Sequence, residues 1–160
     1  MYNTIQEFIM EWNNEAASTQ KVLDALTDAS LQQQVSPEDR TLGRIAFHIA
    51  RSTPGLLSAS GLTVETLPPG APSSAAEIAD KFRKVSADTV DGVRAQWTDS
   101  MLKESVKVFG MELPRAVLLS MLIKHIVHHR GQITVLMRQA GLKVPGVYGP
   151  ARDESVTFGM

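Results

Sequence analysis

Apolar residues recur three or four positions apart in four segments of the 160-residue chain, with polar residues between them. This spacing matches the turn of an α-helix and predicts four helices, over residues 3–26, 42–57, 74–97 and 114–139 or 140. The third helix is the most polar, and the fourth is apolar nearly all round. The chain is long enough to bury one core, so we expect a single domain over residues 1–160.

Residues that favour helix ends mark several of these boundaries. Thr41 is a suitable N-cap for the second helix, and Ser74 with Glu77 three positions later has the pattern of a capping box for the third. Gly141 should end the fourth helix in a left-handed conformation. Pro54 has no amide donor and clashes with the preceding turn, so the second helix is expected to bend there or end just before it.

Two of the connections also have a recognisable pattern. Residues 61–74 contain Gly70 and three prolines and predict an exposed loop. Two short alternating pieces, residues 105–108 and 111–113, surround Phe109-Gly110 and predict a β-hairpin. The expected fold class is therefore all-α, with a small β-hairpin before the last helix.

Composition narrows the functions that this domain can have. The 16 basic and 17 acidic side chains nearly cancel and no basic run occurs, which argues against nucleic acid or an anionic membrane as a partner. No apolar run approaches the roughly 18 residues of a spanning helix, and the first residues do not resemble a signal peptide. We therefore expect a cytoplasmic protein. Because cysteine is absent, nitrogen and oxygen atoms must hold any metal.

The histidines supply the candidate chemistry. His125 and His129 are four positions apart, so they point the same way from the fourth helix. His48 lies in the second helical segment, and if the two helices pack together three imidazoles can converge on one cation. The remaining coordination positions would be free for water or substrate. His128 is turned by about 100° from His129, so a supporting or interface role suits it better than ligation.

Each of these residues also has a simpler interpretation. The histidines could be an exposed cluster or hydrogen-bonded core residues, although three buried rings would need many partners. Arg130 could bind an anionic group of a substrate, or it could be an ordinary salt-bridge partner. The His125 to His129 spacing does not make a zinc protease, because Ile126 stands where that motif has glutamate.

Three strings of residues resemble the DinB/YfiT-like family. They are His-Ile-Val-His-His-Arg-Gly-Gln-Ile at residues 125–133, Gly-Arg-Ile-Ala-Phe-His-Ile at residues 43–49 and Val-Pro-Gly-Val-Tyr-Gly-Pro at residues 144–150. The resemblance implies a four-helix bundle of up-and-down or crossover connectivity, and commonly a homodimer. It also implies a divalent metal held by His48, His125 and His129.

The resemblance leaves the reaction open. Relatives of this kind include mycothiol-dependent isomerases, bacillithiol transferases and damage-inducible proteins without a known reaction. We expect a metal-dependent hydrolase or thiol (S-)transferase that acts on a small molecule, with a low-molecular-weight thiol as one candidate partner and with stress or DNA damage as a candidate inducer. Neutral imidazoles favour zinc or nickel over magnesium or calcium. The alternative is a non-catalytic stress-response bundle that uses its metal only for structure or holds none at all, and a fourth ligand such as Asp39 or Glu154 would support it.

The fourth helix also bears on the assembly. Apolar residues lie on two opposite sides of this helix. The side that carries the histidines has Leu118, Met121, Leu122 and Leu136. The opposite side has Leu119, Ile123, Ile126, Ile133 and Met137. Another helix or a second subunit must cover the second side. We predict a two-fold symmetric homodimer that uses part of residues 114–139 or 3–26.

Overall fold

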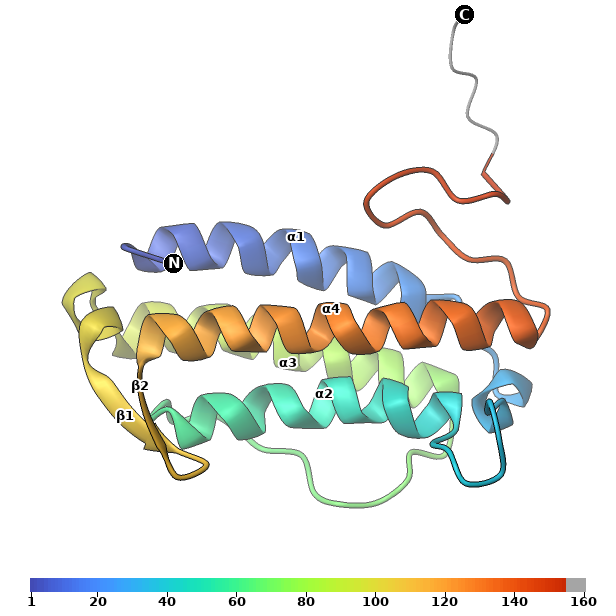
Figure 1. Cartoon of the computed structure of the whole chain (residues 1–160), viewed down its shortest axis with the longest axis horizontal. Coiled ribbons are helices and arrows are strands. Elements are labelled where there is room, and N and C mark those ends of the chain that lie inside the picture. Colours follow the sequence, from blue (N-terminus) through green and yellow to red (C-terminus); the bar gives the residue numbers. More distant parts are fainter. Residues whose placement is uncertain (155–160) are drawn as a thin grey trace, which may run out of the picture.

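Four long helices lie along one axis in the computed structural model, which describes residues 1–154 (Figure 1). They are α1 (Ile5–Asp24), α2 (Leu42–Ala59), α3 (Ala75–Gln96) and α4 (Arg115–Gln139). Short 3-10 turns, η1 (Ala29–Gln32) and η2 (Asp99–Lys103), precede α2 and the hairpin. The strands β1 (Ser105–Val108) and β2 (Met111–Pro114) form the hairpin before α4. The all-α fold and the hairpin predicted from the sequence are confirmed.

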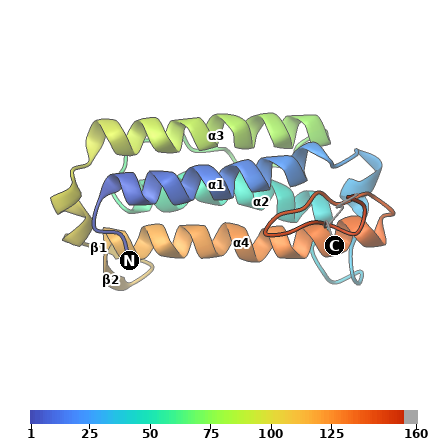
Figure 2. The same cartoon turned by 90° about the horizontal axis from the view of Figure 1, so that it is seen from above.

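The order of the helices around the bundle determines where the site lies. α4 packs against α1 and α2, and α3 packs against the same two helices from the other side. α1 and α4 run in one direction while α2 and α3 run in the other (Figures 1 and 2). Because α2 and α3 are parallel, the connection between them must travel the length of the bundle. Of the two connectivities that the resemblance left open, up-and-down or crossover, the bundle has the crossover one.

The helix ends follow the local signals in the sequence. The side chains of Thr4, Thr41 and Ser74 accept hydrogen bonds from the first-turn amides of α1, α2 and α3. Gly141, with φ of 78°, follows the end of α4. The hairpin turn has Phe109 and Gly110 at φ of 52° and 77°, the left-handed conformation that two-residue hairpin loops require.

Of the two outcomes expected at Pro54, a bend or an end of the helix, the end is wrong, because α2 continues to Ala59. Thr53 and Pro54 are buried, and so is Leu57 one turn later. The Thr53 hydroxyl donates to the carbonyl of Ile49 at 3.0 Å. A proline inside a helix costs about 3 kcal/mol. Burial of Leu57 alone offsets roughly 1.5–3 kcal/mol of this, so packing keeps the segment helical.

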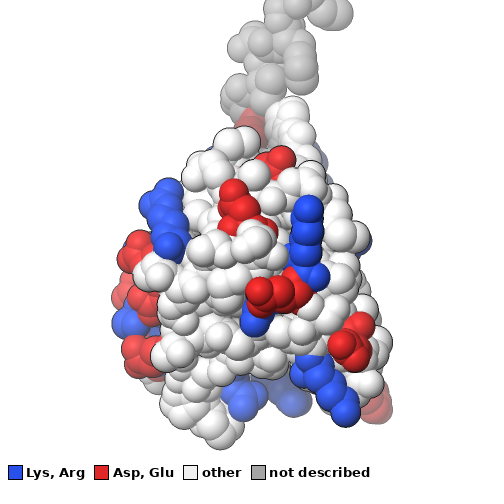
Figure 3. Space-filling model, turned by 90° about the vertical axis from the view of Figure 1, so that its left-hand side faces the viewer, with Lys and Arg blue, Asp and Glu red and all other residues white. Residues whose placement is uncertain are grey.

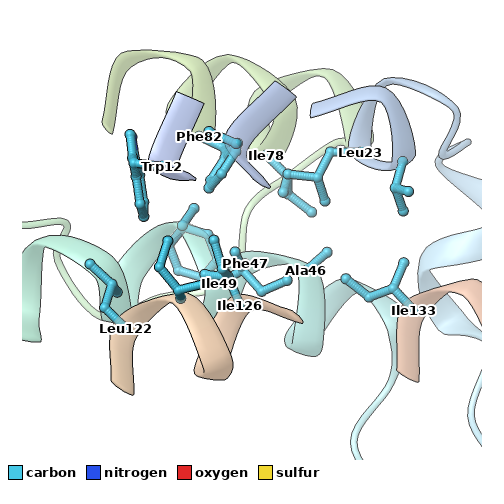
Figure 4. Close-up of a cluster of buried hydrophobic side chains, with 14 of the residues drawn as sticks. Trp12, Leu23, Ala46, Phe47, Ile49, Ile78, Phe82, Leu122, Ile126 and Ile133 are labelled. Atoms are coloured by element: carbon cyan, nitrogen blue, oxygen red, sulfur yellow. The ribbon is translucent and has the colours of Figure 1, made fainter. Parts of the chain in front are cut away.

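The core fills the space between the α1/α3 and α2/α4 pairs. Trp12 and Phe82 come from the first pair, and Ile49, Leu122 and Ile126 come from the second (Figure 4). All five are fully buried. The indole of Trp12 donates to the carbonyl of Ser86 at 3.2 Å, and no buried side-chain nitrogen or oxygen within residues 1–154 lacks a partner. This continuous core fixes α2 and α4 side by side.

A single chain covers both apolar sides of α4. Eight of the nine apolar residues assigned to these sides are buried, and only Met121 is partly exposed. The reason is that α1 and α2 flank α4 on its two sides. Of the two alternatives, another helix covers the second side, so the apolar pattern of α4 does not require a second subunit. The homodimer itself stays a prediction.

The surface agrees with the balanced composition. At the hairpin end of the bundle, basic and acidic side chains are interspersed and do not form a field of one sign (Figure 3). Among the described residues, no helix combines the length and apolarity needed to cross a bilayer.

Candidate metal centre

Three histidines meet at the contact between α2 and α4. His48 comes from α2, and His125 and His129 come from successive turns of α4. The Nε2 atom of His125 lies 3.1 Å from Nε2 of His48 and 3.1 Å from Nε2 of His129. We refer to these three residues as the histidine group. The convergence predicted from their spacing is confirmed.

The packing of the two helices places the group at the edge of the core. Ile49 and Ile126, which are neighbours of the histidines in sequence, point inward and are fully buried. The three imidazoles are only partly buried, so they are held by the core and still reachable from outside. His128 is exposed, and its ring packs edge-on against that of His129 with the ring centroids 4.9 Å apart. It lies outside the histidine group, as its angular offset predicted.

Two polar side chains set the tautomers of the rings on α4. The Nδ1 atom of His129 is 2.8 Å from Oε1 of Gln132, which can only accept, so Nδ1 carries the proton and Nε2 keeps a free lone pair. His125 makes a longer contact of 3.4 Å between Nδ1 and the Ser52 hydroxyl, which itself donates to the carbonyl of Ile49. If Nδ1 of His125 also carries its proton, it donates to the Ser52 hydroxyl and Nε2 keeps a lone pair. The sequence analysis gave neither Gln132 nor Ser52 a role, although Gln132 lies one turn after His129 and Ser52 one turn after His48.

The three rings are neutral near pH 7. Burial, reinforced by the neighbouring His129 and His48, lowers the pKa of His125 to about 4. Burial also lowers the pKa of His48, and His129, Arg40 and Arg51 add to this effect. The pKa of His129 is lowered mainly by burial, although its bond to Gln132 acts in the opposite direction. Neutral imidazoles are the form that binds a metal.

The arrangement fits one cation. With Nδ1 protonated on His125 and His129, two Nε2 lone pairs face each other at 3.1 Å with no proton between them. A cation between them would satisfy both acceptors. Two nitrogens each bound to zinc at 2.0–2.1 Å in a tetrahedral site would be roughly 3.3–3.4 Å apart, close to the observed separation. The histidine group could therefore hold a metal ion.

The group has no fourth protein ligand within residues 1–154. Its mutually close ligand atoms belong to the three histidines alone. Asp39 accepts a hydrogen bond from the Ser36 hydroxyl, and Glu154 accepts from the amides of Gly146 and Ala151. Cavities of about 680 Å³ and 390 Å³ reach His48, and one of about 490 Å³ reaches His129. A cation held here would keep coordination positions open to these spaces.

Arg130 faces away from the histidine group. Its guanidinium is 2% exposed and pairs with Glu15 of α1 at 2.7 Å. It also donates to the Thr19 hydroxyl and to the Tyr148 hydroxyl of the C-terminal segment. We refer to these four residues as the Arg130 network. The geometry favours the salt-bridge interpretation of Arg130 over contact with a substrate.

The fold and site define a four-helix crossover bundle with three histidines at the contact between its second and fourth helices. The chain belongs to the DinB family, whose model matches residues 1–157.

Relatives of similar length are known. The uncharacterized protein YrdA of Bacillus subtilis (strain 168) is 44% identical over 164 residues, which cover 100% of this chain and 97% of YrdA. The crystal structure of a DinB-like protein from Bacillus cereus ATCC 10987 has a TM-score of 0.90 and 49% identity, covering 92% of this chain and 100% of that one. The DinB-like protein YjoA from Bacillus subtilis has a TM-score of 0.69 at 14% identity, covering 88% and 97%, and shares the fold alone.

Proposed function

We propose that the protein is a metal-dependent enzyme that acts on a small molecule by hydrolysis or by thiol transfer. His48, His125 and His129 hold a divalent cation, for which zinc or nickel is the first choice because the ligands are neutral imidazoles. The observation that supports this is the pair of Nε2 atoms of His125 and His129, 3.1 Å apart, in a group that opens onto cavities. Such a cation acts as a Lewis acid and favours the deprotonated form of a water molecule or a thiol.

The residues of the chain have separate tasks in this proposal. Gln132 and Ser52 keep the Nδ1 protons of His129 and His125 in place, so that both Nε2 atoms face the group. Burial keeps the rings neutral, and the shared core of α2 and α4 keeps them together. The cavity beside His48 and His125 is of the size that takes a small ligand.

The open geometry also bears on the non-catalytic alternative. Structural zinc sites are normally closed by four protein ligands, whereas catalytic sites have three and leave one position open. The described residues supply three ligands. This count supports an enzyme over a bundle with a purely structural metal.

Metal analysis of protein purified without an affinity tag tests the site. We expect close to one equivalent of zinc, nickel or another divalent metal, and stabilisation of the stripped protein when metal is returned. Below about a tenth of an equivalent, with no stabilisation, the proposal fails. The reaction is then sought in two screens of the loaded protein, one for hydrolysis of esters, amides and phosphoesters and one for transfer of small thiols to an electrophile.

A pair of neighbouring histidines provides the matched variants. His129→Ala removes a ligand and should weaken metal affinity by more than about 100-fold, since losing even a supporting partner typically costs 10–100-fold. His128→Ala removes the adjacent, exposed ring and should leave affinity and activity within about twofold of wild type. Activity that survives His129→Ala in metal-free protein would contradict a metal-dependent reaction.

A further inference from the structure

A basic cavity adjoins the histidine group. It has a volume of about 390 Å³, and His48, Arg40, Arg44 and Arg51 are among the residues that line it. No Asp or Glu does so. Within residues 1–154 these three arginines form no ion pair, whereas Arg83, Arg115 and Arg130 each pair with a carboxylate. The chain as a whole is nearly neutral, so three unpaired arginines around one cavity are a local concentration of positive charge.

Two of these arginines lie beside the histidine group. Arg51 lines a cavity together with His48 and His125. Arg40 also lines the cavity that reaches His129. Guanidinium groups bind carboxylates and phosphates through paired hydrogen bonds, and no carboxylate within residues 1–154 pairs with these three.

An apolar cavity lies next to the basic one. Its volume is about 680 Å³, its walls include Leu56, Leu67, Pro68, Met121 and Phe109, and it too contains no Asp or Glu. His48 and Arg51 line both cavities. The crossover connection lines them in succession, with residues 66–69 in the apolar cavity and residues 70–72 in the basic one. A ligand that fills both cavities would lie beside these two shared residues.

Phe109 adds to the apolar wall of this cavity from the hairpin. It lies at the tip of the hairpin in a left-handed conformation, and 77% of its surface is exposed. An exposed aromatic side chain on a tight turn gains no stability from burial in this fold. At the cavity wall it is available to contact an apolar ligand.

We propose that the natural ligand of this site is an amphiphilic small-molecule anion. Its carboxylate or phosphate binds Arg40, Arg44 and Arg51, its apolar part fills the cavity between Leu56, Leu67 and Met121, and its middle lies against His48 and His125. The proposal deepens the proposed function by naming the substrate class. The binding itself requires only residues of the chain and is testable apart from any reaction.

Calorimetric titration of the full-length protein as purified tests the proposal with four probes. Octanoate and octyl phosphate carry both parts of the ligand, octanol lacks the anion, and acetate lacks the apolar part. We expect octanoate or octyl phosphate to bind at least about tenfold more tightly than octanol and acetate. The comparison of the two octyl anions tells which anionic group the arginines prefer.

Paired arginine variants identify the residues responsible. Arg44→Gln with Arg51→Gln should weaken binding of the octyl anion by about tenfold or more and leave octanol unchanged. The control, Arg94→Gln with Arg138→Gln, makes the same charge change at exposed positions outside both cavities and should have an effect below about twofold. Because all four side chains are exposed, both variants should fold, which circular dichroism checks.

Three results would overturn the proposal: equal affinity for octanol and octanoate, unchanged anion affinity in the Arg44 and Arg51 variant, or no binding of either octyl anion at millimolar concentration. Zinc titration of the same samples separates this from the proposed function. Anion binding without zinc binding would reject the metal enzyme and keep the ligand class. Zinc binding without anion binding would reject the ligand class and keep the metal enzyme.

Discussion

Two adjacent residues of α4, His129 and Arg130, belong to two regions that differ in how their polar side chains find hydrogen-bond and charge partners. The Arg130 network surrounds the buried side chain of Arg130, whose charge is balanced by Glu15 and whose donors meet acceptors within residues 1–154. The histidine group brings the Nε2 atoms of His125 and His129 within 3.1 Å of each other and is bordered by cavities and by arginines that form no ion pair within residues 1–154. The first region is therefore satisfied as it stands, while the second has room for a ligand that residues 1–154 do not supply. The comparison assigns structural support to the α1 side of α4 and the proposed ligand chemistry to the α2 side.

Among the substitutions that test this difference, Arg130→Ala is expected to change the stability of the protein most. This change leaves Glu15, which is 12% exposed, without its partner at 2.7 Å. Removing one partner of a buried ion pair costs about 3–5 kcal/mol. We expect the free energy of unfolding of the metal-free protein, measured in urea, to fall by that amount. Zinc affinity of the folded variant should change little. If zinc binding collapsed while unfolding stability held, the two sides of α4 would have the reverse of the roles assigned to them.

Gln132→Leu tests the other side with a smaller effect. The substitution is close in volume and removes the amide that holds the Nδ1 proton of His129. Loss of such a partner should weaken zinc binding by about 10–100-fold, or roughly 1.4–2.7 kcal/mol. Gln132 is exposed, so unfolding stability should stay within about 0.5 kcal/mol. Competition with a chelator measures the first quantity and urea unfolding the second; unaltered zinc affinity would show that Gln132 does not orient the ring.

The sequence predicted those features that depend on local periodicity. The spacing of apolar residues located all four helices, Thr41 and Gly141 marked helix ends, and the interval from His125 to His129 fixed their common direction. Predictions that required knowledge of the packing were weaker. Pro54 reads locally as a helix end, yet the burial of residues on both sides of it decides otherwise. Whether α1 and α2 leave any face of α4 open likewise cannot be read from the pattern of α4 alone.

The arginines show the same limit within the site. No pattern in the sequence distinguishes Arg40, Arg44 and Arg51 from other arginines. Only the fold places them around one cavity beside His48. Arg130 drew attention because it follows His129, but a step of one residue turns it by about 100°, toward α1. Helical geometry alone would have separated Arg130 from the histidines. The basic cavity could not be predicted in this way, because residues 70–72 of the crossover connection form part of its wall.

The pH dependence of stability offers a further test of the histidine group. An unfolded histidine titrates near 6.5, and burial lowers the pKa of folded His125 to about 4. Between these values the unfolded chain binds a proton that the native protein does not, so the stability of the metal-free protein is full above pH 6.5 and falls as the pH is lowered toward 4. His125→Gln should flatten this part of the profile, whereas His128→Gln should not. Carboxylates titrate in the same window but are common to all three proteins, so the difference between profiles isolates His125; parallel profiles would contradict its burial as a neutral ring.

The smallest change that separates the two regions is Tyr148→Phe. The Tyr148 hydroxyl accepts from Arg130 at 2.7 Å and donates to Glu15 at 2.9 Å, while the ring lies over the guanidinium with 5.1 Å between the guanidinium carbon and the ring centroid. Phenylalanine keeps the ring and loses only the hydroxyl. Because the Arg130 to Glu15 pair remains, we expect a loss of about 0.5–1.5 kcal/mol in urea unfolding and no change in zinc or octanoate binding. Tyr148→Ala should cost more, since it also removes the cation–π contact. A double-mutant cycle with Glu15→Gln should give a coupling energy above about 0.5 kcal/mol, and additive effects would mean that Tyr148 rests against the bundle without taking part in the network.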